Sequence, residues 1–152
     1  MPKLRAFFKY WLPVLVWMAV IFMASADSKS FEHSSRLLAP LLRWLFPQMS
    51  ADTVHLIVFL ARKCAHVTEY AVLALLLWWA LRKPVKNGPN PWSWRQAGVT
   101  LLIVFFYAAS DEFHQIFVPT RTPAIHDVVI DTLGGAAALL ALWLVGRWRK
   151  RW

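Results

Sequence analysis

The chain has 152 residues, of which 59% are hydrophobic, and its formal net charge is +9 from 17 basic and 8 acidic residues. A soluble domain is usually only about 45–50% apolar, so this composition argues against a soluble protein and for a membrane protein. A single cysteine, Cys64, excludes an internal disulfide. The length suits one domain, and we expect residues 1–152 to form a single transmembrane domain.

Four apolar segments are predicted to span the membrane as helices, at about residues 7–26, 62–81, 97–118 and 124–146. Each approaches the ~20 residues that a helix needs to cross ~30 Å of hydrocarbon. The first segment also resembles a signal peptide, because small residues end it, but its length and its bulky Trp and Phe residues favour a retained span. We therefore predict an all-α integral membrane protein with four transmembrane helices.

The segment between the first two spans is expected to lie outside the membrane core. Residues 36–46 are apolar but too short to span, and Pro40 interrupts them, so they are typical of an interfacial or re-entrant segment. Ser50 or Asp52 is a suitable cap for a helix that begins near Ala51 and continues into the second span.

The basic residues are concentrated in three short segments that contain no acidic residue. Eleven of the 17 lie there, namely Lys3, Arg5, Lys9, Arg82, Lys83, Lys86, Arg95, Arg147, Arg149, Lys150 and Arg151. With four spans, all three segments fall on the same side, and the positive-inside rule identifies this side as the cytoplasm. Both termini are therefore expected in the cytoplasm, and this distribution argues against a nucleic-acid partner.

Five carboxylates and two histidines lie within the predicted spans, all in the half nearest the outer face. They are His66, Glu69, Asp111, Glu112, His114, Asp127 and Asp131. A charged side chain at the centre of a spanning helix costs roughly 2.5–3.5 kcal/mol on insertion scales. These groups must therefore pair, meet water or bind a ligand. We predict that they form an outward-facing polar pocket between the second, third and fourth spans.

Helical spacing places these residues on shared faces. The groups are Lys63, His66 and Tyr70 with Glu69 alongside, then Asp111, His114 and Gln115, then Asp127 and Asp131. Below the last pair, Gly134 and Ala138 form a small-residue face that allows close helix approach. Arg121 lies in the turn between the third and fourth spans, where its guanidinium group suits a phosphate or carboxylate at the pocket mouth.

These residues carry a family resemblance. The motifs are Lys63-x-x-His66-x-x-Glu69-Tyr70, Ser110-Asp111-Glu112-x-His114-Gln115-x-Phe117 and Pro119-x-Arg121, followed by Asp127, Asp131 and Gly134. Together they resemble the motifs of the VanZ-like membrane protein family over nearly the whole chain, and Ser25 is similar to a serine of that family. Two positions depart from the pattern, since Thr120 replaces a usual glycine and Asp131 replaces an asparagine found in many members.

The resemblance implies a bacterial cytoplasmic (inner) membrane protein that acts at the cell envelope, since the family is named for a protein linked to teicoplanin resistance. We expect the pocket to bind the headgroup of a cell-envelope lipid or a related amphiphile, such as a cell-wall precursor or a lipoglycopeptide, and so to affect glycopeptide susceptibility. The expected ligand-binding residues are Lys63, Tyr70, Ser110, Glu112, Gln115, Arg121, Asp127 and Asp131.

Other interpretations of the same residues stay open. A small intramembrane hydrolase or transferase would use acid–base candidates from this set, namely His66, Glu69, Asp111 and His114. No cofactor is predicted, although a divalent metal would find carboxylate and histidine ligands here. The H-E-x-x-H metalloprotease motif is absent from the sequence.

Two further alternatives concern charge alone. A proton or ion pathway is disfavoured, because the inner halves of the predicted spans are almost purely apolar. In the second alternative the polar groups have a purely structural role and bind only one another. The candidate pairs are Lys63–Glu69, His66–Asp111 and Arg121–Asp127. The sequence leaves the oligomeric state undetermined.

Overall fold

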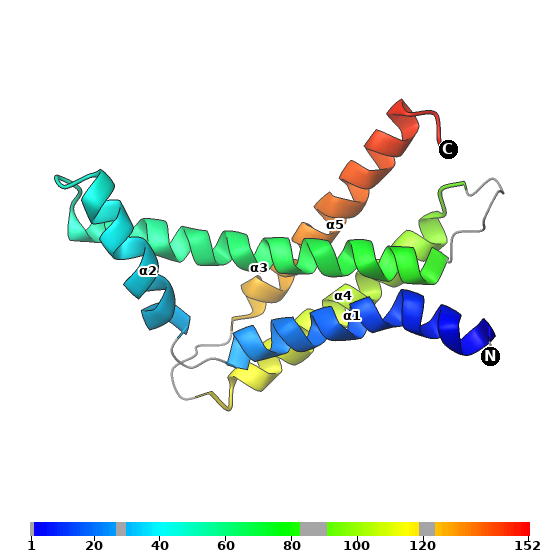
Figure 1. The fold of residues 1–152 in the computed structure, drawn as a ribbon, viewed down its shortest axis with the longest axis horizontal. Helices are drawn as coiled ribbons and strands as arrows, with labels where there is room; N and C mark the ends of the chain where they lie inside the picture. The colour runs from blue at the N-terminus through cyan, green and yellow to red at the C-terminus, as the bar shows by residue number, and fades with distance from the viewer. Residues whose placement is uncertain (1, 27–29, 83–90, 119–123) are drawn as a thin grey trace.

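The computed structural model describes residues 2–26, 30–82, 91–118 and 124–152. These residues form five helices and no strand, which confirms the prediction of an all-α protein (Figure 1). The helices are α1 (Pro2–Ala26), α2 (Ser30–Leu45), α3 (Ala51–Arg82), α4 (Trp94–Gln115) and α5 (Ile125–Trp148).

Three of the described helices are long and apolar enough to cross a membrane. The candidate spans are Phe7–Ser25 in α1, Ala51–Arg82 in α3 and Ile125–Trp148 in α5, which match the first, second and fourth predicted spans. Helix α4 is not among them, because the polar residues in its last turns lower its hydropathy. The four-span topology therefore stays a prediction. Helix α4 also ends at Gln115 rather than near Val118, in a tighter turn.

Helix α3 is the longest element, and it begins where the sequence predicted. The Ser50 hydroxyl accepts a hydrogen bond from the Thr53 backbone N–H at 3.2 Å, so Ser50 caps the first turn. A helix of 32 residues is about 48 Å long, well beyond the hydrocarbon thickness of ~30 Å. Helix α2 contacts α3 and lies beside its N-terminal part (Figure 1). The predicted interfacial residues 36–46 fall in α2 and the turn after it.

Helix α5 approaches α3 closely at Gly134. A Cβ atom at this position would lie 2.7 Å from the Val67 backbone oxygen, a distance that real Cβ atoms do not reach. At the next residue, Gly135, a Cβ atom would lie 3.2 Å from a Val104 methyl group of α4. The glycines therefore bring α5 against both α3 and α4, and the close approach predicted at Gly134 is confirmed.

Helix α1 packs against α3 and α4 through apolar side chains and two polar contacts. Val14 and Ile21 of α1 are at most 1% exposed within the core. The Trp17 indole N–H donates to the Glu69 backbone oxygen at 2.9 Å, and the Tyr107 hydroxyl donates to the Met18 backbone oxygen at 2.6 Å. These contacts hold the C-terminal half of α1 against the helices that carry the predicted polar residues.

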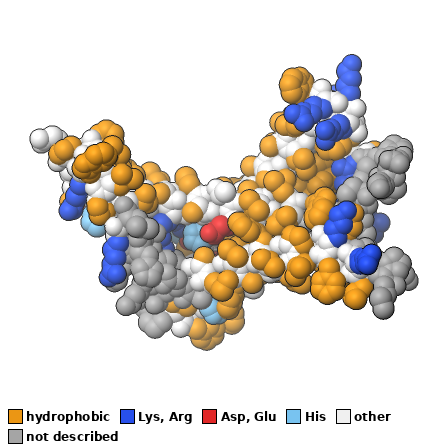
Figure 2. All heavy atoms as spheres, in the orientation of Figure 1, with side chains coloured by type: hydrophobic (Ala, Val, Ile, Leu, Met, Phe, Trp, Pro, Cys, Tyr) orange, Lys and Arg blue, Asp and Glu red, His pale blue; other side chains and the backbone are white. Residues whose placement is uncertain are grey.

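The basic residues gather at one end of the helices. The start of α1, the end of α3, the start of α4 and the end of α5 all lie on the right-hand side of Figure 1, with the end of α5 above the others. Most of the Lys and Arg side chains on the face shown in Figure 2 also lie at this end. We call it the basic end. This arrangement is the one that the positive-inside rule requires. Which side of the membrane the basic end faces stays a prediction.

Candidate functional site

Polar side chains from four helices meet at the end opposite the basic end. We call this set the carboxylate cluster, and it consists of Ser25 of α1, Lys63 and Tyr70 of α3, Asp111, Glu112 and Gln115 of α4, and Asp127 and Asp131 of α5. The C-terminal ends of α1 and α4 and the start of α5 converge there on the middle of α3 (Figure 1). Helix α1 was not expected to contribute, so the pocket predicted from three spans involves four helices.

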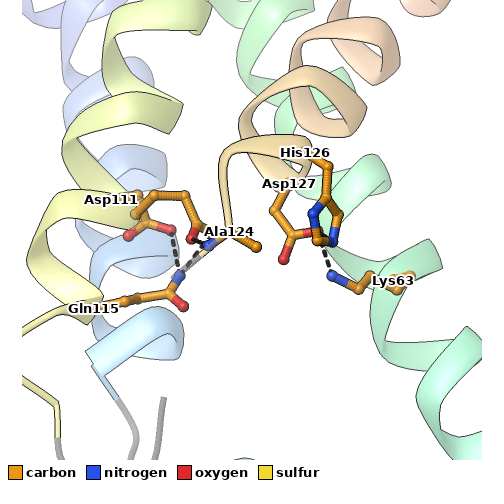
Figure 3. A network of polar contacts seen from close by, with 7 residues as sticks. Lys63, Asp111, Gln115, Ala124, His126 and Asp127 are labelled. Carbon is orange, nitrogen blue, oxygen red and sulfur yellow. Dashed lines mark hydrogen bonds and ion pairs between the residues drawn. The ribbon is translucent and has the colours of Figure 1, made fainter. Parts of the chain in front are cut away.

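The Gln115 amide connects α4 to α1. Its Nε2 atom donates to the Ser25 hydroxyl oxygen at 3.0 Å and to Glu112 Oε1 at 3.2 Å. Asp111 Oδ2 lies at the longer distance of 3.5 Å (Figure 3). Gln115 is 5% exposed and Ser25 is fully buried. One NH₂ group has only two protons, so the bond to Asp111 is the weakest of the three. Gln115 therefore fixes Glu112 more firmly than Asp111.

Glu112 has a second partner at the start of α5. Its Oε2 atom accepts a hydrogen bond from the Ala124 backbone N–H at 2.8 Å (Figure 3). Ala124 is the N-cap residue of α5 and has no side chain that can cap the helix. A carboxylate here satisfies a free backbone donor and interacts favourably with the helix dipole. Both oxygens of Glu112 are thus occupied by neutral donors.

Lys63 forms an ion pair across the α3–α5 crossing. Its ammonium group contacts Asp127 Oδ1, and His126 Nε2 lies 3.4 Å from the same oxygen (Figure 3). One of our alternatives predicted a Lys63–Glu69 pair. In the structure Lys63 pairs with Asp127 of α5 instead. The close approach of α5 to α3 is the physical reason, because it brings the start of α5 to Lys63.

Tyr70, Asp111 and Asp131 are the least satisfied members of the cluster. Within the described part of the chain, neither the Tyr70 hydroxyl nor Asp111 Oδ1 has a partner with good hydrogen-bond geometry, although the two side chains lie close enough for a weak hydrogen bond to each other. Asp131, which is 4% exposed, likewise makes no hydrogen bond to a described residue and lies within electrostatic range of Asp127, Glu112 and Asp111. Buried polar groups are nearly always hydrogen-bonded, so these three groups require an explanation.

The remaining candidates lie at the edge of the cluster or outside it. On α3, His66 Nδ1 lies 3.5 Å from Glu69 Oε2. His114 packs against the Phe22 ring with 4.4 Å between centroids, and it lies within electrostatic range of Asp111. Ser110 is exposed, and its hydroxyl donates to the Tyr107 backbone oxygen at 2.7 Å, so it does not join the cluster.

Two residues complete the comparison with the sequence. Arg121, predicted at the pocket mouth, lies outside the described residues. Ser25 is a member of the cluster that our set of candidate ligand-binding residues omitted. The signal that would have identified Ser25 is its position at the predicted outer end of the first span, at the same depth as the carboxylates.

No group of three or more His, Cys, Asp or Glu side chains within the described ranges is placed to hold a metal ion. Asp111, Glu112 and Asp131 lie near one another without converging on a common point at metal–ligand distance. The divalent metal considered from the sequence therefore stays a hypothesis.

A groove of about 420 Å³ lies between α4 and α5, beside the carboxylate cluster. The described residues that line it are apolar, such as Phe105, Phe113 and Val128, with Glu112 as the one charged residue among them. Figure 2 shows acidic and histidine side chains at the surface near the middle of the face, with hydrophobic side chains beside them. The structure thus places an apolar groove and a buried polar cluster side by side, with Glu112 common to both.

Comparison with protein families agrees with the motifs. The model of the VanZ/LLP1 family matches residues 10–146, a range that includes every member of the carboxylate cluster. Neither the curated proteins nor the solved structures gave a match. Because the family model covers most of the sequence, the chain belongs to the VanZ/LLP1 family.

Proposed function

We propose that this protein binds the headgroup of a cell-envelope lipid, or of a related amphiphile, in the carboxylate cluster. One observation carries the proposal, namely that buried polar groups of poor hydrogen-bond geometry belong to the same cluster as Glu112, which lines an apolar groove. Ionisable side chains inside a membrane are expensive and usually functional. A ligand with a polar head and an apolar tail satisfies both surfaces.

The proposal includes a membrane orientation. Helices α1, α3 and α5 cross the bacterial cytoplasmic membrane, and α4 crosses as the fourth span. The basic end faces the cytoplasm with both termini, as the positive-inside rule requires. The carboxylate cluster then lies in the outer leaflet, where envelope lipids, cell-wall precursors and lipoglycopeptides meet the membrane.

Each part of the cluster has a proposed role. Asp111 and Asp131 accept hydrogen bonds from hydroxyl or amine groups of the ligand, and the Tyr70 hydroxyl adds a further partner. Lys63 and Arg121 interact with an anionic part of the headgroup. An altered supply or position of such amphiphiles is the route by which the protein would affect glycopeptide susceptibility.

Native mass spectrometry of the full chain in a mild detergent tests this proposal. We expect a lipid-sized adduct on the wild type that is lost from Asp111→Asn and Tyr70→Phe. Asp52→Asn is the matched control, because Asp52 is an exposed carboxylate in the first turn of α3, away from the cluster. Equal adducts on all four proteins, or none on any, would contradict the proposal.

A second candidate function is an enzyme that acts on the same amphiphile. The contact between His66 and Glu69 favours it, because a histidine beside a carboxylate is a common general base. Asp111 and His114 are the other acid–base candidates. Under this alternative, Glu69→Gln abolishes turnover of a bound lipid while the lipid adduct persists. If a substitution removes the lipid adduct and the effect on glycopeptide susceptibility together, the result would instead support lipid binding as the only function.

A further inference from the structure

We infer that the ligand of the carboxylate cluster is a phospholipid whose headgroup carries an ammonium group, with one acyl chain in the groove between α4 and α5. This inference rests on the proposed function and specifies the ligand class. Two independent features carry it, namely the charge and hydrogen bonding of the cluster and the shape of the groove.

The first feature is a set of buried carboxyl groups that lie close to one another. Asp111, Glu112 and Asp131 are only 3%, 8% and 4% exposed. Among the described residues, Lys63 provides the ammonium group nearest to them, and it already pairs with Asp127. An ammonium group beside these carboxyl groups would offset their charge when they are ionised, whereas an anionic group would add to it.

Hydrogen bonding points to the same ligand chemistry. Glu112 is saturated by Gln115 and Ala124, but Asp111 Oδ1 and Asp131 have no donor within the described residues. The buried Tyr70 hydroxyl has no partner of good geometry there either, and it lies close to Asp111 and within electrostatic range of Asp131. A primary ammonium group has three N–H donors, as in lysine, and can serve two carboxylates and a hydroxyl oxygen together.

A metal ion is the alternative cation for these carboxyl groups. Metal ligands must converge at about 2.0–2.6 Å from one point, and no three such groups among the described residues are so placed. An ammonium ion holds its acceptors at about 2.7–2.9 Å, so the carboxyl groups need not approach one point as closely as metal ligands do.

The groove provides the second feature. It holds about 420 Å³ between α4 and α5, and apart from Glu112 the described residues of its lining are apolar, such as Ala109, Ile116 and Val129. Both Glu112 and Ala124 line the groove, and they also form the hydrogen bond at the edge of the cluster. A chain in the groove would therefore bring its headgroup to Glu112, at the edge of the cluster.

The test is a competition between two probe lipids with identical acyl chains, phosphatidylethanolamine and phosphatidylglycerol, on the full-length protein in mild detergent. Hydrogen bonds to charged groups contribute about 1.5–3 kcal/mol, which corresponds to roughly a 10- to 100-fold preference. We expect native mass spectrometry to show this preference for the ethanolamine lipid. Equal retention, or a preference for the glycerol lipid, would overturn the inference.

Two variants separate the headgroup from the chain. Asp131→Asn should bring the two lipids close to equal retention, and Asp111→Asn serves the same purpose if the first variant does not fold. Val129→Trp should fill the groove and reduce both lipids without changing their ratio. The matched control is Leu133→Trp, at a residue of α5 that is also exposed but does not line the groove.

The outcomes distinguish this inference from the proposed function. A lipid that is retained without headgroup preference, or whose preference survives both aspartate variants, overturns the ammonium inference and leaves lipid binding intact. A co-purified adduct with the mass of a metal ion, or of an amphiphile other than a phospholipid, also overturns the inference. Absence of any adduct from the wild type contradicts both.

Discussion

The basic end and the carboxylate cluster carry ionisable side chains of opposite sign, and the two regions differ in how deeply these side chains are buried. At the basic end, Arg82 lies over the rings of Trp78 and Trp152, with 5.3 and 4.9 Å to the centroids, and it donates to the Pro91 backbone oxygen at 2.9 Å. At the other end, Asp111 and Asp131 are almost completely buried. The positive charges thus lie on aromatic rings near the surface, whereas the negative charges are enclosed between helices.

This difference has an energetic meaning. Exposed charges keep most of their hydration, so their individual contacts contribute at most about 1 kcal/mol. Buried charges lose their hydration and depend on each partner that remains. Substitutions should therefore have large effects in the carboxylate cluster and small ones at the basic end.

The largest effect is expected for Lys63→Met. The substitution removes the ammonium group that pairs with Asp127 and leaves this carboxylate near Asp131 and Glu112. Breaking a fully buried pair costs about 3–5 kcal/mol, and because both side chains here are 21–27% exposed, we expect about 2–3 kcal/mol. Equilibrium unfolding in mixed detergent micelles would measure the change in the free energy of unfolding.

The control for this prediction is the double variant Lys63→Met with Asp127→Asn. It removes the uncompensated carboxylate, so most of the lost stability should return. If the double variant loses as much stability as Lys63→Met and Asp127→Asn lose in sum, the two side chains are not energetically coupled. The buried charges would then not depend on their partners, as the comparison between the two ends assumes.

The second effect, of about 1–3 kcal/mol, is expected for Gly134→Ala. The new Cβ atom would lie 2.7 Å from the Val67 backbone oxygen, so α3 and α5 must separate. Gly98→Ala is the matched control on α4, because no atom lies within 4 Å of its added Cβ and alanine favours a helix. Thermal unfolding followed by circular dichroism should show a lower Tm for the first variant and an equal or higher Tm for the second.

The close approach at Gly134 also explains how far the sequence predicted the site. Helical spacing correctly grouped Lys63 with Tyr70 and Asp127 with Asp131, because spacing within one helix depends only on its 3.6-residue period. It did not predict that Lys63 pairs with Asp127, since partners across helices depend on how α5 is rotated and seated against α3.

The fold was predictable to a similar degree. Hydropathy located α1, α3 and α5, and the Ser50 cap correctly indicated that α3 begins at Ala51. Ser110 shows where the pattern misled, because its hydroxyl binds the Tyr107 carbonyl of its own helix instead of the cluster. Serine often makes this bond in helices, and the choice between it and an interhelical contact cannot be read from spacing.

A third effect, of about 1 kcal/mol, is expected for Tyr107→Phe. The substitution removes the hydroxyl that donates to the Met18 backbone oxygen at 2.6 Å and so weakens the attachment of α1 near the cluster. The control is Tyr10→Phe at the basic end, since the Tyr10 hydroxyl makes no hydrogen bond to a described residue and its ring contact with Trp79 is retained. Equal losses in the two variants, measured by unfolding in mixed micelles, would argue that the Tyr107 bond does not stabilise the fold.

The smallest effect, at most about 0.5 kcal/mol, is expected for Arg147→Gln. Its guanidinium group lies 5.6 Å from the Trp143 ring centroid, and such contacts contribute only about 0.5–1 kcal/mol at exposed sites. Glutamine retains part of the packing, and the other basic residues keep the orientation that the positive-inside rule requires. Both the Tm and the accessibility of the C-terminus to a membrane-impermeant reagent should therefore stay unchanged. A loss as large as that of Lys63→Met would mean that charge burial does not distinguish the two ends, because Arg147 would then depend on its partner as strongly as an enclosed charge does.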